Sequence, residues 1–253
     1  PKPENFTLNK KIKFNYEIKT ENKTSRNIIG LVKGNDETLG NEFVSIGAHY
    51  DHEGVKNGQV YYGADDNGSG TVTVLEVARQ LMLNKNNKRP VLLMFHAAEE
   101  KGLKGSKYLT TNSDFIDSII AHLNFDMVGR KSEDSIYCIG ASKISSKLGK
   151  LIEDVNSRTS DFVLDYKFDD PNDPQRLYYR SDHYNYAKLG IPIAFFYDYM
   201  KIDYHKPTDT ADKIDFDLLM TRTKLIFATA WQLANQEKRL LIDNGIFENT
   251  QSL

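Results

Sequence analysis

The stretch FVSIGAHYD, residues 43–51, gives the clearest indication of the fold. Its apolar run, Phe43 to Ala48, has the length of a buried strand, and it leads directly into polar residues that can bind a ligand, His49-Tyr50-Asp51. Further along, Gly68-Ser69-Gly70 precedes apolar residues at helical spacing from Val74 to Met82. A strand followed by a helix is the repeating unit of an α/β sheet.

The same pattern recurs along most of the chain. Four further apolar runs are candidate strands: Val91 to Phe95, Ile119 to Phe125, Ser135 to Ile139 and Ile191 to Tyr197. Helical spacing follows from Ile144 to Val155, and Leu218 to Leu241 is a candidate for a long closing helix. This alternation predicts an α/β fold with a mixed, mostly parallel central sheet, flanked by helices on both faces, in one domain over residues 1–253.

The beginning of the chain has a different pattern. Ile12, Phe14, Tyr16 and Ile18 alternate with polar residues, which is typical of a half-buried strand, and Ile28 to Val32 is a second apolar run. We therefore expect residues 1–40 to be an amino-terminal, β-rich segment of the same domain.

Composition excludes several classes of protein. The chain carries 33 basic and 35 acidic side chains, well mixed, so no basic face for nucleic acid or anionic lipid is expected. No apolar stretch approaches the roughly 20 residues of a transmembrane helix, and Pro1-Lys2-Pro3-Glu4 lacks the features of a signal peptide. A single cysteine, Cys138, rules out a thiolate zinc site. The sequence does not indicate the oligomeric state.

Three of the candidate strands lead into acids or histidines. His49-Tyr50-Asp51 follows the first, Glu99-Glu100 the second and Asp126 the third. Ligands bind at the carboxyl ends of strands in open α/β sheets, so these groups are expected to converge. Carboxylates at such close range require cations, and Asp, Glu and His supply the oxygen and nitrogen ligands of zinc. The sequence therefore favours a catalytic metal centre.

Each of these segments has an ordinary structural alternative when it is taken alone. The alternatives are a hydrogen-bonded pair at His49-Tyr50-Asp51, a turn with a helix cap at residues 63–70, a solvated acidic turn at Glu99-Glu100, a hydrogen-bonded core aspartate at Asp126 and an exposed histidine at Tyr204-His205. If all five structural alternatives were correct, the occurrence of these five segments in one chain would be a coincidence.

Other polar residues carry weaker signals. The remaining histidines, His52, His96, His122 and His183, are expected either to contact the metal ligands or to be structural, and for His96 and His122 the structural role is favoured. Arg180-Ser181-Asp182-His183 resembles a helix start at which Ser181 caps the helix and Arg180 faces the crevice. The irregular stretch from Asp165 to Gln175 is expected either to form a rim over the site or to be a solvated surface loop.

Taken in order, the motifs resemble those of a known enzyme family. They are Gly47-Ala48-His49-Tyr50-Asp51, Ala64-Asp65-Asp66-Asn67-Gly68-Ser69-Gly70, Ala98-Glu99-Glu100, Asn124-Phe125-Asp126-Met127 and Tyr204-His205. The sequence from about Val44 to Ile214 is similar to the co-catalytic di-zinc aminopeptidases of the bacterial leucyl aminopeptidase and aminopeptidase Y type. The resemblance implies a zinc-exopeptidase fold and two Zn²⁺ ions, in whose place other divalent metals are possible.

The resemblance also implies a role for each matching residue. The implied metal ligands are Asp66, which would bridge both ions, Glu100 and His205 at one ion, and His49 and Asp126 at the other. Glu99 would be the general base, Asp51 would orient His49, and Tyr204 would stabilise the tetrahedral intermediate. Arg180 is a candidate substrate contact, and no role follows for Asp65.

The implied function is hydrolysis of the peptide bond next to a free amino terminus, with peptides as substrates and an extracytoplasmic location. Alternatives are a glutaminyl-peptide cyclase, a carboxypeptidase or dipeptidase of the same superfamily, and a metal-free, non-catalytic binding domain. The short segment Glu100 to Ser106 and the presence of Tyr204, where cyclases usually have tryptophan, favour an aminopeptidase over a cyclase.

Overall fold

A seven-stranded sheet forms the centre of the molecule. The computed structural model describes residues 5, 7, 10–130, 134–198 and 202–244. In their order across the sheet, the strands are β1 (Ile28–Val32), β5 (Val91–His96), β2 (Phe43–His49), β6 (Ile119–Asp126), β9 (Ile193–Tyr197), β7 (Ser135–Ile139) and β8 (Val163–Asp165). The four strands β5, β2, β6 and β9 run parallel, whereas β1 and β7 pair antiparallel with their neighbours β5 and β9. The predicted mixed, mostly parallel sheet is confirmed.

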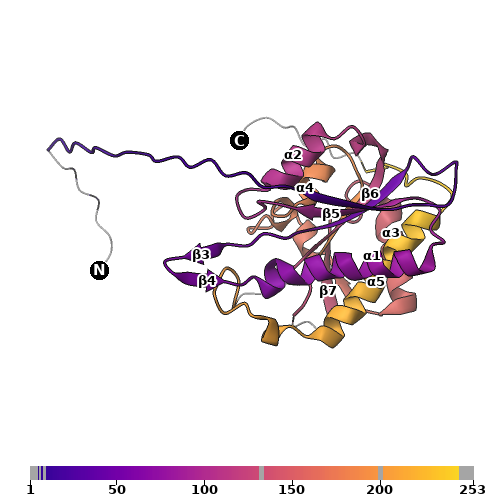
Figure 1. Ribbon diagram of the computed structural model, residues 1–253. Helices are drawn as coiled ribbons and strands as arrows, with labels where there is room; N and C mark the ends of the chain where they lie inside the picture. The colour runs from indigo at the N-terminus through magenta and orange to yellow at the C-terminus, as the bar shows by residue number, and fades with distance from the viewer. Residues whose placement is uncertain (1–4, 6, 8–9, 131–133, 199–201, 245–253) are drawn as a thin grey trace.

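Helices cover both faces of this sheet (Figure 1). On one face lie α1 (Gly70–Asn84), α3 (Ser146–Thr159) and α5 (Phe216–Asn235), and on the other lie α2 (Lys104–Asn112) and α4 (His183–Ala187). The shorter elements are η1 (Ala64–Ser69), η2 (Ile116–Ser118), η3 (Lys167–Asp169), η4 (Leu177–Tyr179), η5 (Ala211–Lys213) and a hairpin of β3 (Gly54–Lys56) and β4 (Gln59–Tyr61). The fold thus has three layers.

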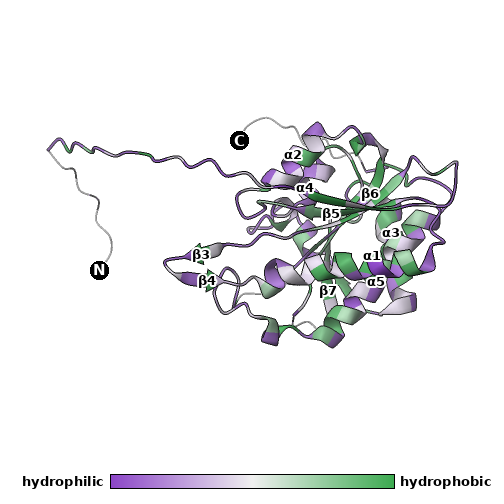
Figure 2. Cartoon of the chain, viewed as in Figure 1, coloured by the Kyte–Doolittle hydropathy of each residue, from purple (hydrophilic) through white to green (hydrophobic). Residues whose placement is uncertain are grey.

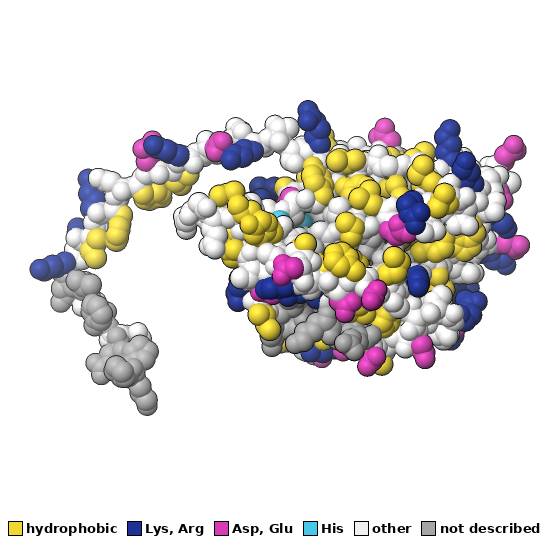
Figure 3. All heavy atoms as spheres, turned by 60° about the horizontal axis from the view of Figure 1, so that its bottom comes forward, with side chains coloured by type: hydrophobic (Ala, Val, Ile, Leu, Met, Phe, Trp, Pro, Cys, Tyr) yellow, Lys and Arg dark blue, Asp and Glu magenta, His cyan; other side chains and the backbone are white. Residues whose placement is uncertain are grey.

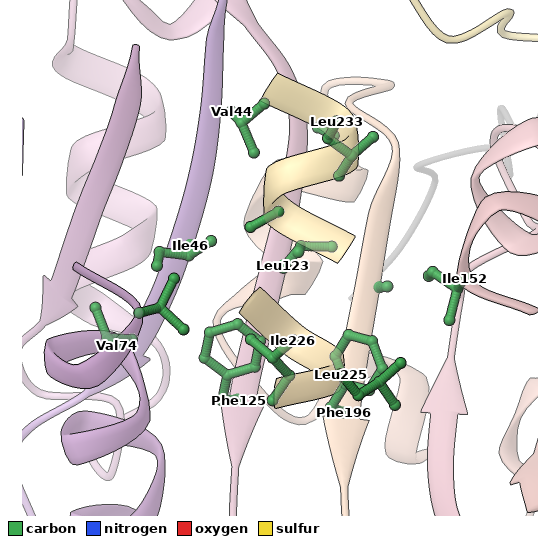
Figure 4. Close-up of a cluster of buried hydrophobic side chains, with 14 of the residues drawn as sticks. Val44, Ile46, Val74, Leu123, Phe125, Ile152, Phe196, Leu225, Ile226 and Leu233 are labelled. Carbon is green, nitrogen blue, oxygen red and sulfur yellow. The ribbon is translucent and has the colours of Figure 1, made fainter. Parts of the chain in front are cut away.

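The main core lies between the sheet and the face that carries α1, α3 and α5. Val44 and Ile46 of β2 point into it because alternate side chains of a strand share one face. They belong to the same buried cluster as Leu225, Ile226 and Leu233 of α5, and Figure 4 shows Val44 beside Leu233. Each such side chain contributes roughly 1.5–3 kcal/mol by leaving water. Figure 2 shows the central strands as largely hydrophobic and the loops as largely hydrophilic.

The predicted strands and helices of the sheet are confirmed, with small shifts at their ends. The strands β2, β5 and β6 each continue one residue further than expected and end at His49, His96 and Asp126. Helix α5 ends at Asn235 rather than at Leu241, because Gln236 already has an extended backbone. The ends of these strands therefore carry the polar residues themselves.

The expected amino-terminal strand at residues 12–18 is wrong. Residues 10–27 form no helix or strand, and Phe14 and Tyr16 are 80% and 81% exposed. This segment extends away from the folded body (Figures 1 and 3). Alternation predicts a strand with one buried face, but a strand also needs a neighbouring strand for its backbone hydrogen bonds. Among the described residues, the segment at 12–18 has no such neighbour. Among the described part of residues 1–40, β1 is the only strand. The single domain over residues 1–253 stays a prediction.

In the described ranges, none of the helices combines the length and the hydropathy needed to span a bilayer.

Candidate metal centre and active site

Three ligand-type side chains meet at the carboxyl ends of β2 and β6. His49 is the last residue of β2, Asp126 is the last residue of β6, and Asp66 lies in η1, directly before α1. The Nε2 atom of His49 lies 3.4 Å from Asp66 Oδ1 and 3.5 Å from Asp126 Oδ2. All three side chains are buried. They form the first ligand group, which we call the His49 group.

A second ligand group lies on the other side of Asp66. The Nε2 atom of His205 lies 3.3 Å from Asp66 Oδ2 and 3.0 Å from Glu100 Oε2. We call Asp66, Glu100 and His205 the His205 group. Asp66 therefore presents one carboxylate oxygen to each group. The structure brings together all five residues that the sequence predicted as metal ligands.

The donor atoms of both groups fit divalent cations. Several buried atoms have no hydrogen-bond partner in the described part of the chain, namely His49 Nε2, Asp66 Oδ2, Glu100 Oε1 and Asp126 Oδ1. Leaving such atoms buried and unpaired is costly, and a cation would satisfy them. Oxygen and imidazole ligands without sulfur suit zinc and similar divalent metals.

The pKa shifts show how strongly these acids compete for positive charge. Burial would raise the pKa of Glu100, but contacts with the imidazoles of His205 and His52 outweigh it and lower this pKa to about 2. Contacts with Asp66 and Glu100 raise the pKa of His205 to about 10. For Glu99, burial and then the nearby carboxylates outweigh His49 and raise the pKa well above its usual value.

The outer ring nitrogens of the two histidine ligands also have partners. His49 Nδ1 lies 3.0 Å from the backbone oxygen of Asp51 and 3.8 Å from its carboxylate. The same carboxylate accepts the backbone N–H of Glu99 at 3.1 Å. His205 Nδ1 lies 3.6 Å from Glu53. Such partners fix the orientation of a ligating imidazole. The contact expected between Asp51 and His49 is made mainly by the Asp51 backbone.

A pocket opens beside the two ligand groups. Its polar side is lined by Asp66, Glu99, Asp126, Arg180, Tyr204 and His205, and its remaining wall by Met127, Gln175, Leu177, Phe195 and Tyr197. Arg180 donates a hydrogen bond of 3.2 Å to the Tyr204 hydroxyl, and the Tyr204 ring stacks on His205. Gln175 places the end of the loop from Asp165 to Gln175 at the pocket, as the rim prediction required. Histidine atoms are visible in a surface recess in Figure 3.

The loop that carries Asp66 is held tightly against β6. Asn67 donates a hydrogen bond of 2.8 Å to the backbone oxygen of Phe125. Gly70, the first residue of α1, lies so close that a Cβ atom would be 2.3 Å from Asn67 Oδ1 and 2.4 Å from the Phe125 oxygen. Only glycine allows this approach. Asp65, for which the sequence indicated no role, accepts the backbone N–H of Gly129 at 2.8 Å.

Ser181 has a different role from the one expected. Helix α4 begins at His183, and Ser181 does not cap it. Instead, the Ser181 hydroxyl donates a hydrogen bond of 2.7 Å to Asp126 Oδ2 and thereby orients a ligand of the His49 group. His96 and His122 are fully buried, next to Tyr186 and Ser45, in agreement with a structural role.

Sequence reasoning missed two residues at the site, Glu53 and Asp209, and left His52 either as a neighbour of the metal ligands or as a structural residue. The fully buried Asp209 carboxylate accepts the backbone N–H groups of Asp65 and Asp66, each at 3.1 Å. Its position four residues after His205 was the only available signal. Asp209 therefore ties the loop of His205 to the loop of Asp66.

We expect an Asp209→Asn variant to be destabilised by about 1–3 kcal/mol, because charge-assisted hydrogen bonds to two backbone amides are weakened. It should also bind divalent metal more weakly, since Asp66 is less firmly placed. Urea unfolding of the metal-free protein and metal titration measure the two effects. Asp212→Asn, an exposed aspartate in the same segment, is the matched control and should change neither. Wild-type stability and metal affinity in the Asp209 variant would contradict this role.

Comparisons with known proteins show which family model, relatives and solved structures the chain resembles. The family model described as "Peptidase family M28" matches residues 27–230. A probable leucine aminopeptidase of Trichophyton verrucosum is 31% identical over 218 residues, which cover 82% of this chain and 57% of that protein. Leucine aminopeptidase 1 of Neurospora crassa is 31% identical over 211 residues, which cover 77% of this chain and 51% of that protein. The chain thus spans little more than half the length of these relatives.

Solved structures with the same fold include two bacterial aminopeptidases. The aminopeptidase of Aneurinibacillus sp. strain AM-1 superposes with a TM-score of 0.68 at 29% identity, over 86% of this chain and 50% of its own. The zinc aminopeptidase of Bacillus subtilis superposes with a TM-score of 0.67 at 25% identity, over 86% of this chain and 52% of its own. Porphyromonas gingivalis glutaminyl cyclase, with a TM-score of 0.61 at 20% identity, over 80% of this chain and 76% of its own, shares the fold.

Proposed function

Because this chain belongs to peptidase family M28, we propose that it is a zinc-dependent aminopeptidase that acts on peptides with a free amino terminus. The aminopeptidase names of its relatives and the zinc aminopeptidase of Bacillus subtilis support this proposal. The observation that carries it is the position of Asp66 between two ligand groups, with Glu99 in the same pocket. The reaction class is metal-assisted hydrolysis.

The proposed cofactor is a pair of zinc ions, one in the His49 group and one in the His205 group, with Asp66 shared. Zinc, when bound, polarises the scissile carbonyl and makes water more acidic. Other divalent metals with oxygen and nitrogen preference are compatible with the same donors.

Glu99 is the proposed general base. Its backbone is held by Asp51, and its side chain reaches the pocket beside Asp66 and Asp126, where the reacting water and the peptide carbonyl would lie. Glu99 would take a proton from the water and return it to the leaving amine. Glu100 next to it belongs to the His205 group, so the two neighbouring glutamates have different roles.

Tyr204 and Arg180 are proposed to hold the substrate. The Tyr204 hydroxyl accepts a hydrogen bond from Arg180, which leaves its own hydrogen available for the oxygen that becomes negative during hydrolysis. The carboxylates of the pocket suit the free α-ammonium group. Leu177 and Phe195 line the wall, so an apolar first side chain is the proposed preference.

The test is a panel of aminoacyl anilides and dipeptides with zinc-loaded protein. We expect release of free amino acids, fastest from substrates with an apolar first residue, loss of activity with a chelator, and recovery on addition of zinc. Pyroglutamate formation from an amino-terminal glutamine peptide, measured in parallel, tests the cyclase alternative. Protein that forms pyroglutamate but leaves every anilide intact would overturn the aminopeptidase proposal.

Three remaining alternatives are separated when peptides with a blocked amino terminus are added to the panel. Hydrolysis of peptides with a blocked amino terminus and a free carboxyl terminus would indicate a carboxypeptidase. Hydrolysis of unblocked dipeptides and of no other substrate would indicate a dipeptidase. A metal-free binding domain would hydrolyse none of them. An extracytoplasmic location stays a prediction from the family resemblance.

A further inference from the structure

His52 is a partly buried residue with a buried side chain, and the proposed mechanism gives it no role. It follows β2 by three residues, and its side chain is only 8% exposed. The ring packs over Gly63, where an added Cβ atom would lie 2.4 Å from His52 Cγ. Gly63 has a left-handed backbone, with φ of +63°, and directly precedes the η1 loop that carries Asp66. The turn before the metal loop is therefore shaped to accept the His52 ring.

The His52 ring is directed at the His205 group. Its Nδ1 atom lies 2.9 Å from Glu100 Oε1 and 3.9 Å from Asp66 Oδ2. Donor atoms of His52, Asp66 and Glu100 lie within 4.8 Å of one another. Ligand atoms that share one zinc ion at about 2.0–2.2 Å have similar separations. His52 therefore lies beside Oε1 of Glu100, whereas His205 lies beside Oε2 of the same carboxylate.

The hydrogen bonding of His52 supports the same interpretation. Neither ring nitrogen of His52 has a hydrogen-bond partner among the described residues, and the same holds for Glu100 Oε1. The Nδ1 and Oε1 atoms make an ion-pair contact of 2.9 Å. A buried imidazole without a hydrogen-bond partner is costly. A cation placed between Nδ1 and Oε1 would satisfy both atoms.

We propose that His52 is an additional nitrogen ligand of the metal position in the His205 group. The proposal rests on the metal centre of the proposed function. That position then has His52, Asp66, Glu100 and His205 as protein ligands, whereas the His49 group has His49, Asp66 and Asp126. A set of four protein ligands is typical of closed zinc sites, and a set of three leaves an open position for water or substrate. The His205 position therefore fills first and binds zinc more tightly than the His49 position.

The direct test is the NMR spectrum of the histidine ring nitrogens in the ¹⁵N-histidine-labelled, metal-free protein during zinc addition. The chain has six histidines, and single His→Gln variants assign their signals. We expect the first zinc equivalent to shift the ring nitrogens of His52 and His205, and the second to shift those of His49. The signals of the buried His96, His122 and His183 should stay in place. A His52 ring that keeps its metal-free signals at two equivalents of zinc would overturn the proposal.

A zinc titration of His52→Gln against a chromophoric chelator gives the energetic counterpart. We expect the tighter of the two sites to weaken at least about 100-fold, because loss of an outer partner alone typically costs 10–100-fold. The second site of the same variant is the internal control. Equal affinities in variant and wild type would contradict the proposal. If the histidine shifts occur but no peptide is hydrolysed, the proposed function fails while the ligand assignment holds.

Discussion

A Glu99→Gln variant is expected to bind zinc as the wild type does and to hydrolyse peptides about 10²–10⁴-fold more slowly. Glutamine keeps the size and shape of the side chain but does not accept a proton. Glu99 belongs to neither ligand group, and its backbone N–H is held by Asp51, so the substitution leaves the metal centre in place. The change should appear in kcat, because the proton transfer occurs in the transition state.

The neighbouring Glu100→Gln variant is the matched comparison. Glu100 contacts both His205 and His52, at 3.0 Å and 2.9 Å, so its replacement is expected to weaken zinc binding as well as activity. Metal analysis and steady-state kinetics on both variants, loaded with excess zinc, separate the two roles. Near wild-type kcat in Glu99→Gln would show that another group is the base.

The parts of the site predictable from sequence are those at the ends of regular elements. Apolar runs mark the strands, so the residues that follow them, such as His49 and Asp126, can be placed at one edge of the sheet from the amino-acid pattern alone. The bridging position of Asp66 came from the family resemblance, and the distances to His49 and His205 support it.

Sequence reasoning missed Glu53 and Asp209 and left the role of His52 open, and all three residues lie in loops. His52 and Glu53 follow directly after His49-Tyr50-Asp51. The spacing of apolar residues predicts helices and strands, but it does not predict the direction of side chains in a loop. Asp209 acts on backbone amides 143 and 144 residues away. Such contacts depend on the packing of loops against each other. The amino-terminal pattern failed for the opposite reason, since local alternation at residues 12–18 lacks a tertiary partner.

Replacement of Asp66 by asparagine is expected to have the largest effect on the metal centre. Asp66 Oδ1 faces His49 and Asp66 Oδ2 faces His205, and the asparagine amide can offer only one oxygen and one nitrogen that is not a ligand. Without the charge of Asp66, the two ligand groups also have less negative charge to balance two bound cations. We expect zinc binding to fall below two ions per chain. Peptide hydrolysis should fall by about 10³-fold or more, which corresponds to about 4 kcal/mol.

Asp65→Asn is the control, because it makes the same chemical change one residue earlier. Asp65 faces Gly129 rather than the ligand groups, and an asparagine oxygen can still accept that backbone N–H. The Asp65 variant should therefore keep two zinc ions and most of its activity. Zinc content after equilibrium dialysis and initial rates at saturating zinc give the comparison. If Asp65→Asn lost its zinc while Asp66→Asn kept both ions, the bridging role would belong to Asp65, and the carboxylate that links the two metal positions would have to be reassigned.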